Sequence, residues 1–275
     1  MSISVLVLTL NEELNIGACL ESVQWSDDVL ILDSFSTDRT VEIAHQHGVR
    51  VVQRQFDNYA AQRNFGLQQK YAHPWVLMLD ADERVPPDLQ AEMRAATQTA
   101  APTIDLFRMR RRDHLFDRWI RGSSGYPTWF GRLARLGRVR VERPYNEEYH
   151  AAGDVADLQG HLEHYPFNKG LSDWIAKHNR YSTLEAQLLL QGAAATVHWP
   201  HLFCRDADLR RRAAKAVVYR LPFRPLAVFT ALYLMRGGIF EGRAGLTFCV
   251  LRAWYEFLID CKVIELRRRQ EGRSI

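Results

Sequence analysis

The sequence predicts an α/β fold in which a mainly parallel central sheet is flanked by helices and followed by a helical C-terminal extension. Two near-continuous apolar runs, at residues 3–8 and 75–79, indicate strands that are buried on both faces. A segment with helical apolar spacing separates the first run from another apolar run at residues 29–32, which makes a β-α-β unit. Basic residues gather among apolar stretches from Arg205 onward, which indicates an extension with a role of its own.

The composition is that of an intracellular globular protein. The chain has 275 residues, enough for one large domain or a domain with an appendage. Hydrophobic residues make up 47% and charged residues 25%, so a disordered chain is not expected. The four cysteines lie far apart without C-x-x-C spacing, and the first strand begins without the pattern of a signal peptide. Both features favour reduced thiols in the cytosol.

Polar residues follow the first two predicted strands. Thr9, Asn11 and Glu12 come after the first strand, and Asp33 directly follows the second. Ligands of parallel sheets bind in a crevice outside the carboxyl ends of the strands, so these side chains are expected to line it. Asp33 is placed to accept hydrogen bonds from a base or ribose, whereas the Ser and Asp residues after it serve mainly as turn and cap residues.

A short third strand at residues 49–53 precedes a helix at residues 58–70 that carries Arg63. The guanidinium fork of Arg63 matches the paired oxygens of a diphosphate. The spacing suits a solvated helix face equally well, so both interpretations stay open.

The strand at residues 75–79 leads directly into Asp80, Asp82 and Glu83. Carboxylates two positions apart face the same way if the chain stays extended, and a divalent cation relieves their mutual repulsion. Mg²⁺ or Mn²⁺ takes one or two protein carboxylates and completes its shell with water and substrate phosphates. The expected ligand is therefore a phosphorylated molecule, although an isolated D-x-D is also a common polar turn.

Four motifs occur in order: SVLVLTLNEE at residues 4–13, LDSFSTDRT at 32–40, AQRN at 61–64 and WVLMLDADE at 75–83. This succession resembles the nucleotide-sugar domain of family 2 glycosyltransferases, which have the GT-A fold. It is most similar to the bacterial branch of lipopolysaccharide core β-1,4-glucosyltransferase-like proteins, over most of the chain. One departure lies at Ser34-Phe35, where the family often has an acid followed by glycine.

The resemblance implies a role for each matched residue. The Asp33 equivalent reads the nucleobase, the turn from Thr9 to Glu12 and the Asp80 equivalent hold the nucleoside, and the Asp82 equivalent binds the metal. The donor is then a nucleoside-diphosphate sugar, with a UDP-sugar favoured, and the cofactor is Mg²⁺ or Mn²⁺. The acceptor is a glycan or a lipid-linked molecule.

Glu147 is the predicted catalytic base, because its position matches the acid that follows an arginine-bearing strand in the resembling branch. A partly desolvated carboxylate can take the proton of an acceptor hydroxyl. The adjacent Glu148 is the alternative base, and a surface acidic pair is the structural alternative. Trp119, Tyr126 and Trp129 are candidates either for stacking on a sugar or for core packing.

His164 ends a predicted strand and is a candidate late metal ligand, although a lone histidine there is often structural. In a predicted helix at residues 172–192, Lys177, Arg180 and Tyr181 are spaced i, i+3 and i+4 and share one face. This segment resembles the basic lid motif of the branch. Its two cations are expected to neutralise the departing diphosphate, and a solvated helix face is the alternative.

From Arg205 onward the chain has 15 Lys/Arg against 7 Asp/Glu, a net charge of +8, which leaves 4 − 8 = −4 for residues 1–204. Apolar stretches at 226–235 and 253–259 alternate with arginines, which suits helices lying on an anionic membrane surface rather than on nucleic acid. Neither stretch reaches the roughly 20 residues of a spanning helix. Ordinary packing helices or a homo-oligomer interface are the alternatives.

The sequence therefore predicts an inverting, metal-dependent glycosyltransferase of lipopolysaccharide core or other cell-surface polysaccharide synthesis, peripheral on the inner face of the cytoplasmic membrane. Residues 1–100 are expected to form the nucleotide-sugar half, 101–200 the acceptor half with its lid helix, and 201–275 the basic amphipathic extension. Two alternatives stay open. A sugar-phosphate nucleotidyltransferase would need a glycine-rich basic loop where this chain has an acidic turn, and a noncatalytic binding module would have a degenerate nucleotide-sugar site.

Overall fold

The computed structural model describes residues 3–143, 147–193, 199–204, 209–210, 213, 216–217 and 223–275. The chain divides into two compact units, the first made of residues 1–114 and 126–169 and the second of residues 115–125 and 170–275. The three functional regions predicted from the sequence have other boundaries, at residues 100 and 200. The lid helix and the segment 115–125 belong to the same unit as the C-terminal helices.

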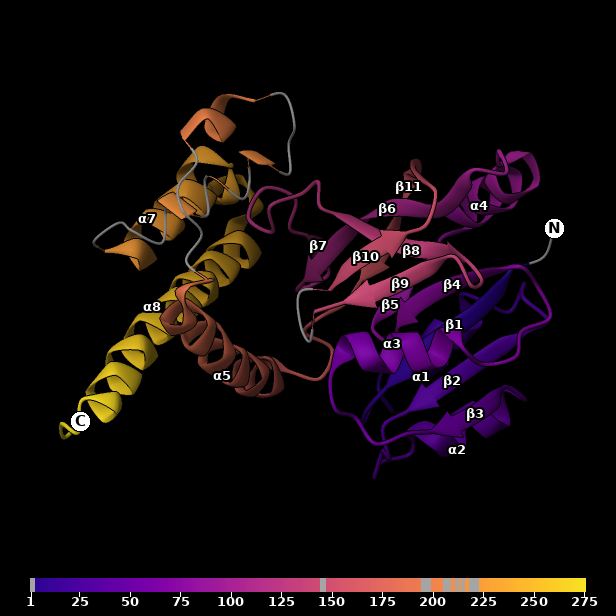
Figure 1. Ribbon diagram of the computed structural model, residues 1–275, viewed down its shortest axis with the longest axis horizontal. Coiled ribbons are helices and arrows are strands. Elements are labelled where there is room, and N and C mark those ends of the chain that lie inside the picture. Colours follow the sequence, from indigo (N-terminus) through magenta and orange to yellow (C-terminus); the bar gives the residue numbers. More distant parts are fainter. Residues whose placement is uncertain are drawn as a thin grey trace. The chain divides into compact units, whose positions relative to one another are not determined.

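The first unit is built around one sheet. Its strand order is β3-β2-β1-β4-β8-β6-β11-β5 (Figure 1). The elements are β1 (Ser4–Thr9), α1 (Ile16–Glu21), β2 (Val29–Asp33), α2 (Thr40–Gln46), β3 (Arg50–Gln53), α3 (Tyr59–Leu67), β4 (Trp75–Asp80), β5 (Glu83–Arg84), α4 (Pro87–Thr99), β6 (Ile104–Leu115), β8 (Trp129–Arg135), β9 (Val139–Glu142), β10 (Glu148–Ala151) and β11 (Asp154–His164).

Most strand pairs in this sheet are parallel. β1 runs parallel to β2 and β4, β2 to β3, and β6 to β11, whereas β8 is antiparallel to β4 and β6, and the two-residue β5 is antiparallel to β11. The predicted fold class, a mainly parallel central sheet flanked by helices, is therefore confirmed.

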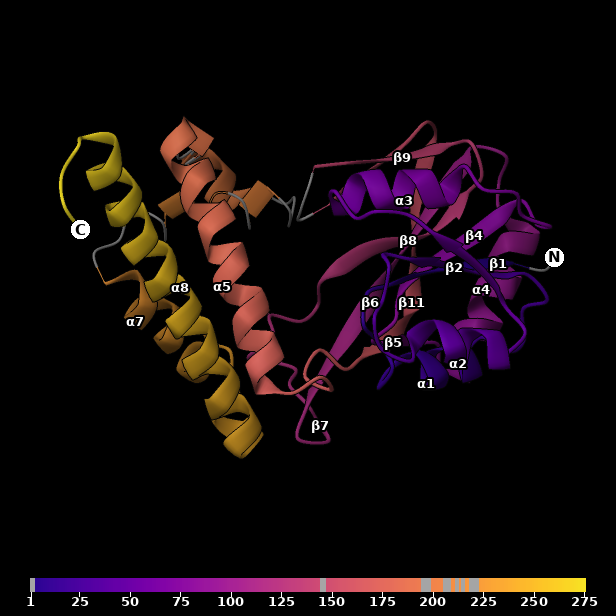
Figure 2. The same ribbon diagram turned by 90° about the horizontal axis from the view of Figure 1, so that it is seen from below.

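Two apolar layers cover the two faces of the sheet. On one face, α1, α2 and α4 pack on alternate residues such as Val5, Ile31 and Leu77. On the other face, α3 and the β9–β10 hairpin cover Leu6 and Met78. Figure 2 shows α1 and α2 on the side of the sheet opposite α3. Because β1 and β4 are buried on both faces, their sequences have to be apolar at successive positions.

The second unit is mainly helical. Its elements are β7 (Arg118–Trp119), α5 (Leu171–Leu188), the π-helix η1 (Leu189–Ala193), η2 (Trp199–Phe203), α7 (Arg224–Thr230), η3 (Ala231–Met235), η4 (Gly238–Glu241) and α8 (Gly242–Gln270). Helix α8 lies beside both α5 and α7 (Figures 1 and 2). The buried side chain of Arg224 joins α7 to α8 through ion pairs of 3.1 Å to Glu256 and 3.1 Å to Asp260. None of the helices among the described residues has both the length and the apolar character needed to cross a membrane.

Gly66 allows α3 to approach the sheet closely. A Cβ atom at this position would lie 2.5 Å from Cδ2 of Leu6, which is fully buried on β1. Arg63, three residues earlier on α3, bonds Asp80 at the end of β4. The packing at Gly66 therefore helps to set the position of a residue in the crevice.

Gly66→Ala is expected to lower the free energy of unfolding by about 1–3 kcal/mol, because the core around Leu6 has no room for a methyl group. Gly17→Ala in α1 is the matched control, since its Cβ would lie 3.9 Å from Ile43 Cγ2. That substitution is expected to be neutral or to stabilise by up to about 1 kcal/mol. Urea denaturation measures both, and equal stability of the two variants would contradict the packing argument.

Candidate functional site

The register of the sheet brings the ends of β1, β2 and β4 together. Thr9 pairs with Asp33 on β2, and Leu8 pairs with Asp80 on β4. The polar residues that follow these strands therefore meet at one edge of the sheet. Nine of the predicted site residues belong to the first unit: Thr9, Asn11, Glu12, Asp33, Arg63, Asp80, Asp82, Glu147 and His164.

Asp33 is fully buried and joins three strand ends. Its Oδ1 accepts hydrogen bonds from Thr9 Oγ1 (2.8 Å) and Ser36 Oγ (2.5 Å). Its Oδ2 accepts from the Ser36 amide (2.9 Å) and Gln53 Nε2 (3.0 Å). A carboxylate has about four lone-pair sites, so the protein itself fills those of Asp33. Its part in reading a nucleobase stays a prediction.

The turns after β1 and β2 are bonded to each other. The Asn11 amide donates to Ser36 Oγ (2.8 Å), and Asn11 Oδ1 accepts from the Thr37 amide (2.8 Å). Asn11 and Phe35 have φ angles of +54° and +61°, in the left-handed region. This conformation costs an L residue other than glycine roughly 1–2 kcal/mol, less for asparagine. Phe35 thus occupies, with strain, the position at which the resembling family often has glycine.

Glu12 is held at this edge of the sheet by a lysine that sequence reasoning misses. Lys169 Nζ lies 2.9 Å from Glu12 Oε1 and 3.3 Å from the carbonyl oxygen of Leu10. Burial raises the pKa of Glu12, and the negative charge of Asp82 raises it further, against the lowering effects of Asn15 and Lys169. The turn after β1 is therefore close enough to the D-x-D segment for their charges to interact.

Two buried arginines fix the acids around the end of β4. Arg63 is 1% exposed and Arg132 is 2% exposed. Asp80 pairs with Arg63 Nη2 (2.7 Å) through Oδ1 and with Arg132 Nη2 (2.8 Å) through Oδ2. Glu83, also fully buried, accepts from Arg132 (2.7 Å) and from the Asp80 amide (3.0 Å). Arg63, the predicted diphosphate ligand, uses its Nε for Glu147 (2.6 Å), so it lies inside a network of ion pairs.

The charges in this network keep Arg132 protonated. Burial would lower the pKa of Arg132, but Glu83 and Asp80 raise it well above its ordinary value. Arg132 therefore stays charged. A buried charge is tolerated when it is paired and hydrogen-bonded, as it is here.

The structure separates the two candidate bases. Glu147 lies 2.6 Å from Arg63 and accepts from Tyr149 Oη (3.4 Å), so it shares the network of Asp80. Glu148 pairs with the exposed Arg143 at 3.1 Å. Of the two, Glu147 is the one that the protein holds near the acids of β4.

Asp82 and His164 lie together, as a metal site requires. His164 Nε2 is 3.2 Å from Asp82 Oδ2, and His164 Nδ1 is 2.6 Å from Asp113 Oδ1. Burial and Arg111 lower the pKa of His164, but Asp82 and Asp113 outweigh them and raise it. The amide of Tyr165 donates to the Asp82 carbonyl oxygen (2.9 Å), which joins the end of β11 to the D-x-D turn.

This pair fits a hard divalent cation. A carboxylate behind the far nitrogen of a histidine is the usual arrangement around metal-binding imidazoles, and Asp113 supplies it. No group of three or more His, Cys, Asp or Glu side chains placed to hold a metal occurs within the part of the chain that the structure describes. Two protein ligands are nevertheless what Mg²⁺ or Mn²⁺ commonly take when a phosphate completes the shell.

The predicted lid residues belong to the second unit. Lys177 and Arg180 both lie on α5, where Lys177 Nζ is 5.9 Å from the centre of the Tyr181 ring and Arg180 is exposed. Their role toward a diphosphate stays a prediction.

Of the candidate sugar-stacking residues, Trp119 belongs to the second unit and the other two to the first. The ring centre of Trp129 lies 5.8 Å from the guanidinium group of Arg108 and 5.2 Å from that of Arg110, and Tyr126 Oη lies 2.5 Å from His161 Nε2. Their contact with a sugar stays a prediction.

Residues 4–153, more than half of the chain, match the family described as Glycosyl transferase family 2. The chain belongs to this family. The resemblance seen in the four motifs is therefore confirmed, and the protein is a glycosyltransferase. Of the functions that the sequence left open, the family supports this one over a nucleotidyltransferase.

Relatives of this family 2 glycosyltransferase extend over most of its length. The lipopolysaccharide core biosynthesis glycosyltransferase LpsC of Rhizobium meliloti (strain 1021) is 27% identical over 274 residues, which cover 96% of this chain and 93% of LpsC. An uncharacterized glycosyltransferase of Rickettsia felis is 28% identical over 201 residues, 69% of this chain and 70% of the relative. A structure of glucosyl-3-phosphoglycerate synthase from Mycobacterium tuberculosis with Mn²⁺, UDP and glucosyl-3-phosphoglycerate is 25% identical and covers 40% of this chain and 44% of that one. Its TM-score of 0.35 is too low to support a conclusion.

The residues of the candidate site that sequence reasoning misses include Arg132, Asp113 and Lys169. Arg132 carries a signal, because an arginine between the buried Gly131 and Leu133 of a strand needs a buried acid as its partner. Asp113 and Lys169 carry none, since their partners lie 51 and 157 positions away in the chain.

Proposed function

We propose that this family 2 glycosyltransferase moves a sugar, with inversion, from a nucleoside-diphosphate sugar to a glycan or lipid-linked acceptor, and that it uses Mg²⁺ or Mn²⁺. The observation that carries the proposal is the Asp82–His164 pair, backed by Asp113 and placed beside the Asp80 network. A UDP-sugar is the proposed donor. The similarity to LpsC supports an acceptor from lipopolysaccharide core or another cell-surface polysaccharide.

The charge of the site supports a bound cation. Five carboxylates face three guanidinium groups, which leaves a formal charge of −2 when His164 is neutral, as a metal ligand must be. The carboxylates are Asp80, Asp82, Glu83, Asp113 and Glu147, and the guanidinium groups are Arg63, Arg111 and Arg132. A divalent ion would balance this charge and attract a diphosphate, which the acids alone would repel.

In the proposed reaction, the acceptor oxygen bonds to the anomeric carbon as the bond from that carbon to the diphosphate breaks. Glu147 takes the proton of the acceptor hydroxyl, and Arg63 orients its carboxylate. Asp82 and His164 would hold the cation, which supplies charge stabilisation for the departing nucleoside diphosphate. Lys177 and Arg180 are proposed to add positive charge there.

Asp82→Asn is expected to abolish the metal dependence of nucleotide binding. Calorimetry should show that wild-type protein binds UDP about tenfold more tightly with Mn²⁺ than with EDTA, because the ion binds both the acids of the site and the diphosphate. The matched control is Asp27→Asn, a carboxylate that is 74% exposed and pairs with His73. Metal-independent UDP binding that survives Asp82→Ala would instead support a noncatalytic module. For an active enzyme, slow hydrolysis of a panel of nucleotide sugars would identify the donor.

Glu147→Gln is expected to lower kcat by about 10²–10⁴-fold, the usual loss for a general base. Binding of UDP with Mn²⁺ should change by less than about threefold, because an amide can still accept from Arg63. Glu148→Gln is the control and should keep its activity. Circular dichroism at the assay temperature confirms that both variants are folded, and a loss confined to Glu148→Gln would move the base to that residue.

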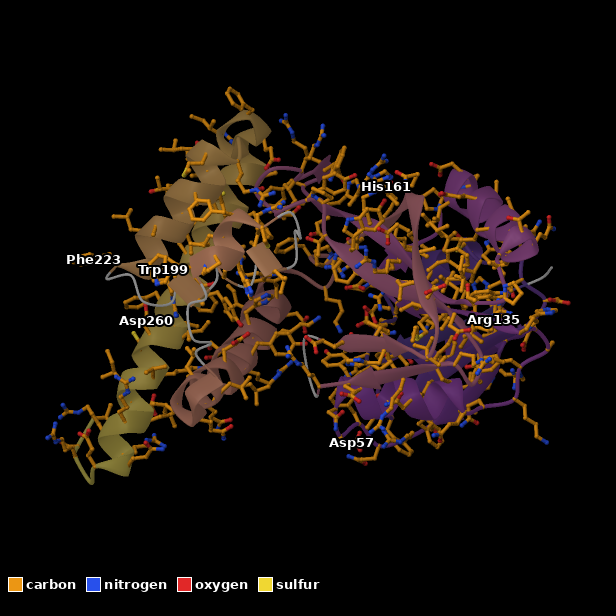
Figure 3. All side chains as sticks on the ribbon, turned by 45° about the horizontal axis from the view of Figure 1, so that its top comes forward. Asp57, Arg135, His161, Trp199, Phe223 and Asp260 are labelled. Carbon is orange, nitrogen blue, oxygen red and sulfur yellow. The ribbon has the colours of Figure 1, made fainter. Side chains whose placement is uncertain are left out.

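The second unit is proposed to attach the enzyme to an anionic membrane surface. Its exposed large apolar side chains include Phe223, Leu226, Leu234, Met235, Ile239, Phe240, Leu246, Val250, Phe257 and Ile264. Phe223 stands at the beginning of α7 (Figure 3). By the sequence, this unit has 19 Lys/Arg against 10 Asp/Glu, a net charge of +9, so its charge complements that of anionic lipids.

Helix α8 is apolar on two faces. Tyr255 and Ile259 are buried in a cluster with Ala186 of α5. Leu246, Val250, Phe257 and Ile264 are 42–59% exposed, and their spacing of 4, 7 and 7 residues puts them on one line along the helix. An apolar line next to Arg267, Arg268 and Arg269 suits a helix lying flat in a membrane interface.

Replacing Met235 and Phe240 together by serine should lower the partition coefficient onto phosphatidylethanolamine–phosphatidylglycerol vesicles, measured by flotation, by at least about tenfold, since burying each such side chain is worth about 1.5–3 kcal/mol. Both side chains are 82% exposed. Leu14→Ser is the control, an exposed leucine (65%) of the first unit. Wild-type protein that stays at the bottom of the gradient would contradict the proposal. A dimer in sedimentation that the double variant dissociates would assign the face to a second copy.

A further inference from the structure

The turn after β2 holds a large aromatic side chain in a conformation that favours glycine. Phe35 has φ = +61° and is 52% exposed. Because half of the ring faces solvent, burial in the core does not offset the strain. A strained residue that the surrounding structure maintains is a sign of function.

The chain on both sides of Phe35 is fixed. The Ser34 amide donates to the Thr9 carbonyl oxygen (2.9 Å), and Ser34 Oγ accepts from Gln62 Nε2 (3.1 Å). Ser36 is bound through its amide and hydroxyl to Asp33. The backbone at Phe35 therefore cannot relax without breaking several of these bonds, so the position from which its ring projects is fixed.

Phe35 has an apolar neighbour on the adjacent turn. Leu10 is 45% exposed and lies between Thr9 and Asn11, in the segment bonded to Ser34 and Ser36. Two exposed apolar side chains thus stand among polar groups at the edge of the sheet where ligands of parallel sheets bind. Within a nucleoside-diphosphate sugar, the nucleobase is the part that has flat faces able to stack on a ring.

We infer that Phe35 is the stacking platform for the nucleobase of the donor, with Leu10 beside it. This inference rests on the proposed function and names the residue that holds the base by its face. The hydrogen bonds that saturate Asp33 fit this inference. Asp33 then shapes the turn, and Phe35 on that turn holds the base. Stacking of a base on an aromatic side chain is strong enough to outweigh the strain of one left-handed residue.

The test uses Phe35→Gly, Phe35→Tyr and Phe116→Gly in the full-length protein, with Mn²⁺ present. Phe35→Gly should raise the melting temperature by a few degrees, through relief of strain, while weakening UDP binding by about tenfold. Binding of inorganic pyrophosphate, which has no base, should stay within about twofold of wild type. Phe35→Tyr should keep the UDP affinity, because a phenol ring stacks as well as a phenyl ring.

Phe116→Gly is the matched control, since Phe116 is also a strained, exposed phenylalanine, with φ = +51° and 59% exposure, but lies in the second unit. It should gain stability and leave UDP binding unchanged. UDP binding by Phe35→Gly that equals wild type would overturn the inference, as would equal losses for UDP and pyrophosphate. A wild-type protein that binds no UDP would refute the proposed function instead.

Discussion

Arg63 and Arg132 are the constraint on which the rest of the site depends. They are almost inaccessible to solvent, and each bonds two of the three carboxylates Asp80, Glu83 and Glu147. Removing one partner from such a group leaves a buried charge uncompensated, at a cost of about 3–5 kcal/mol. Helix α3, the end of β4, strand β8 and the residue before β10 are therefore held in one arrangement. Arg63 and Glu147 are 84 positions apart in the chain, so this arrangement joins distant segments of the first unit.

The same constraint gives the two carboxylates of the D-x-D segment different tasks. In an extended chain they would face the same way, but the chain turns at Ala81 and Asp82 before β5, and Glu83 returns to accept from the Asp80 amide. Asp80 is consequently paired with the two arginines, whereas Asp82 pairs with His164. Because Arg63 and Arg132 neutralise Asp80 and Glu83, the negative charge of Asp82 remains, on the side where a cation would bind.

The sequence predicts the fold and the strand ends well, because burial of both faces forces apolar runs such as Val76–Leu79, and the residues after such runs lie at a known edge of the sheet. It also predicts His164 near Asp82, although by resemblance to a family rather than by spacing. What it cannot predict are pairs of polar residues distant in the chain, such as Lys169 with Glu12, because such pairs leave no periodicity. The ion pairs of Arg63 cannot be predicted for the same reason, because an arginine in a helix has the same sequence pattern whether it faces solvent or a buried acid. The strain at Phe35 is visible in the sequence only as a departure from the family's glycine.

The distribution of charge explains why such an enzyme would need a cation at all. Since the whole chain carries +4 and the second unit +9, the first unit carries 4 − 9 = −5. A nucleoside diphosphate is itself an anion, and screening at physiological ionic strength acts beyond about 8 Å, so the repulsion is felt mainly within the crevice. Three guanidinium groups that face the acids of the site, those of Arg63, Arg111 and Arg132, are already paired with them. On the proposed function, further positive charge would come from an ion held at Asp82 and His164, and from the basic second unit, whose charge suits a diphosphate and a lipid surface alike. A donor bound as its metal complex meets this requirement, because the ion that balances the site also carries the diphosphate into it.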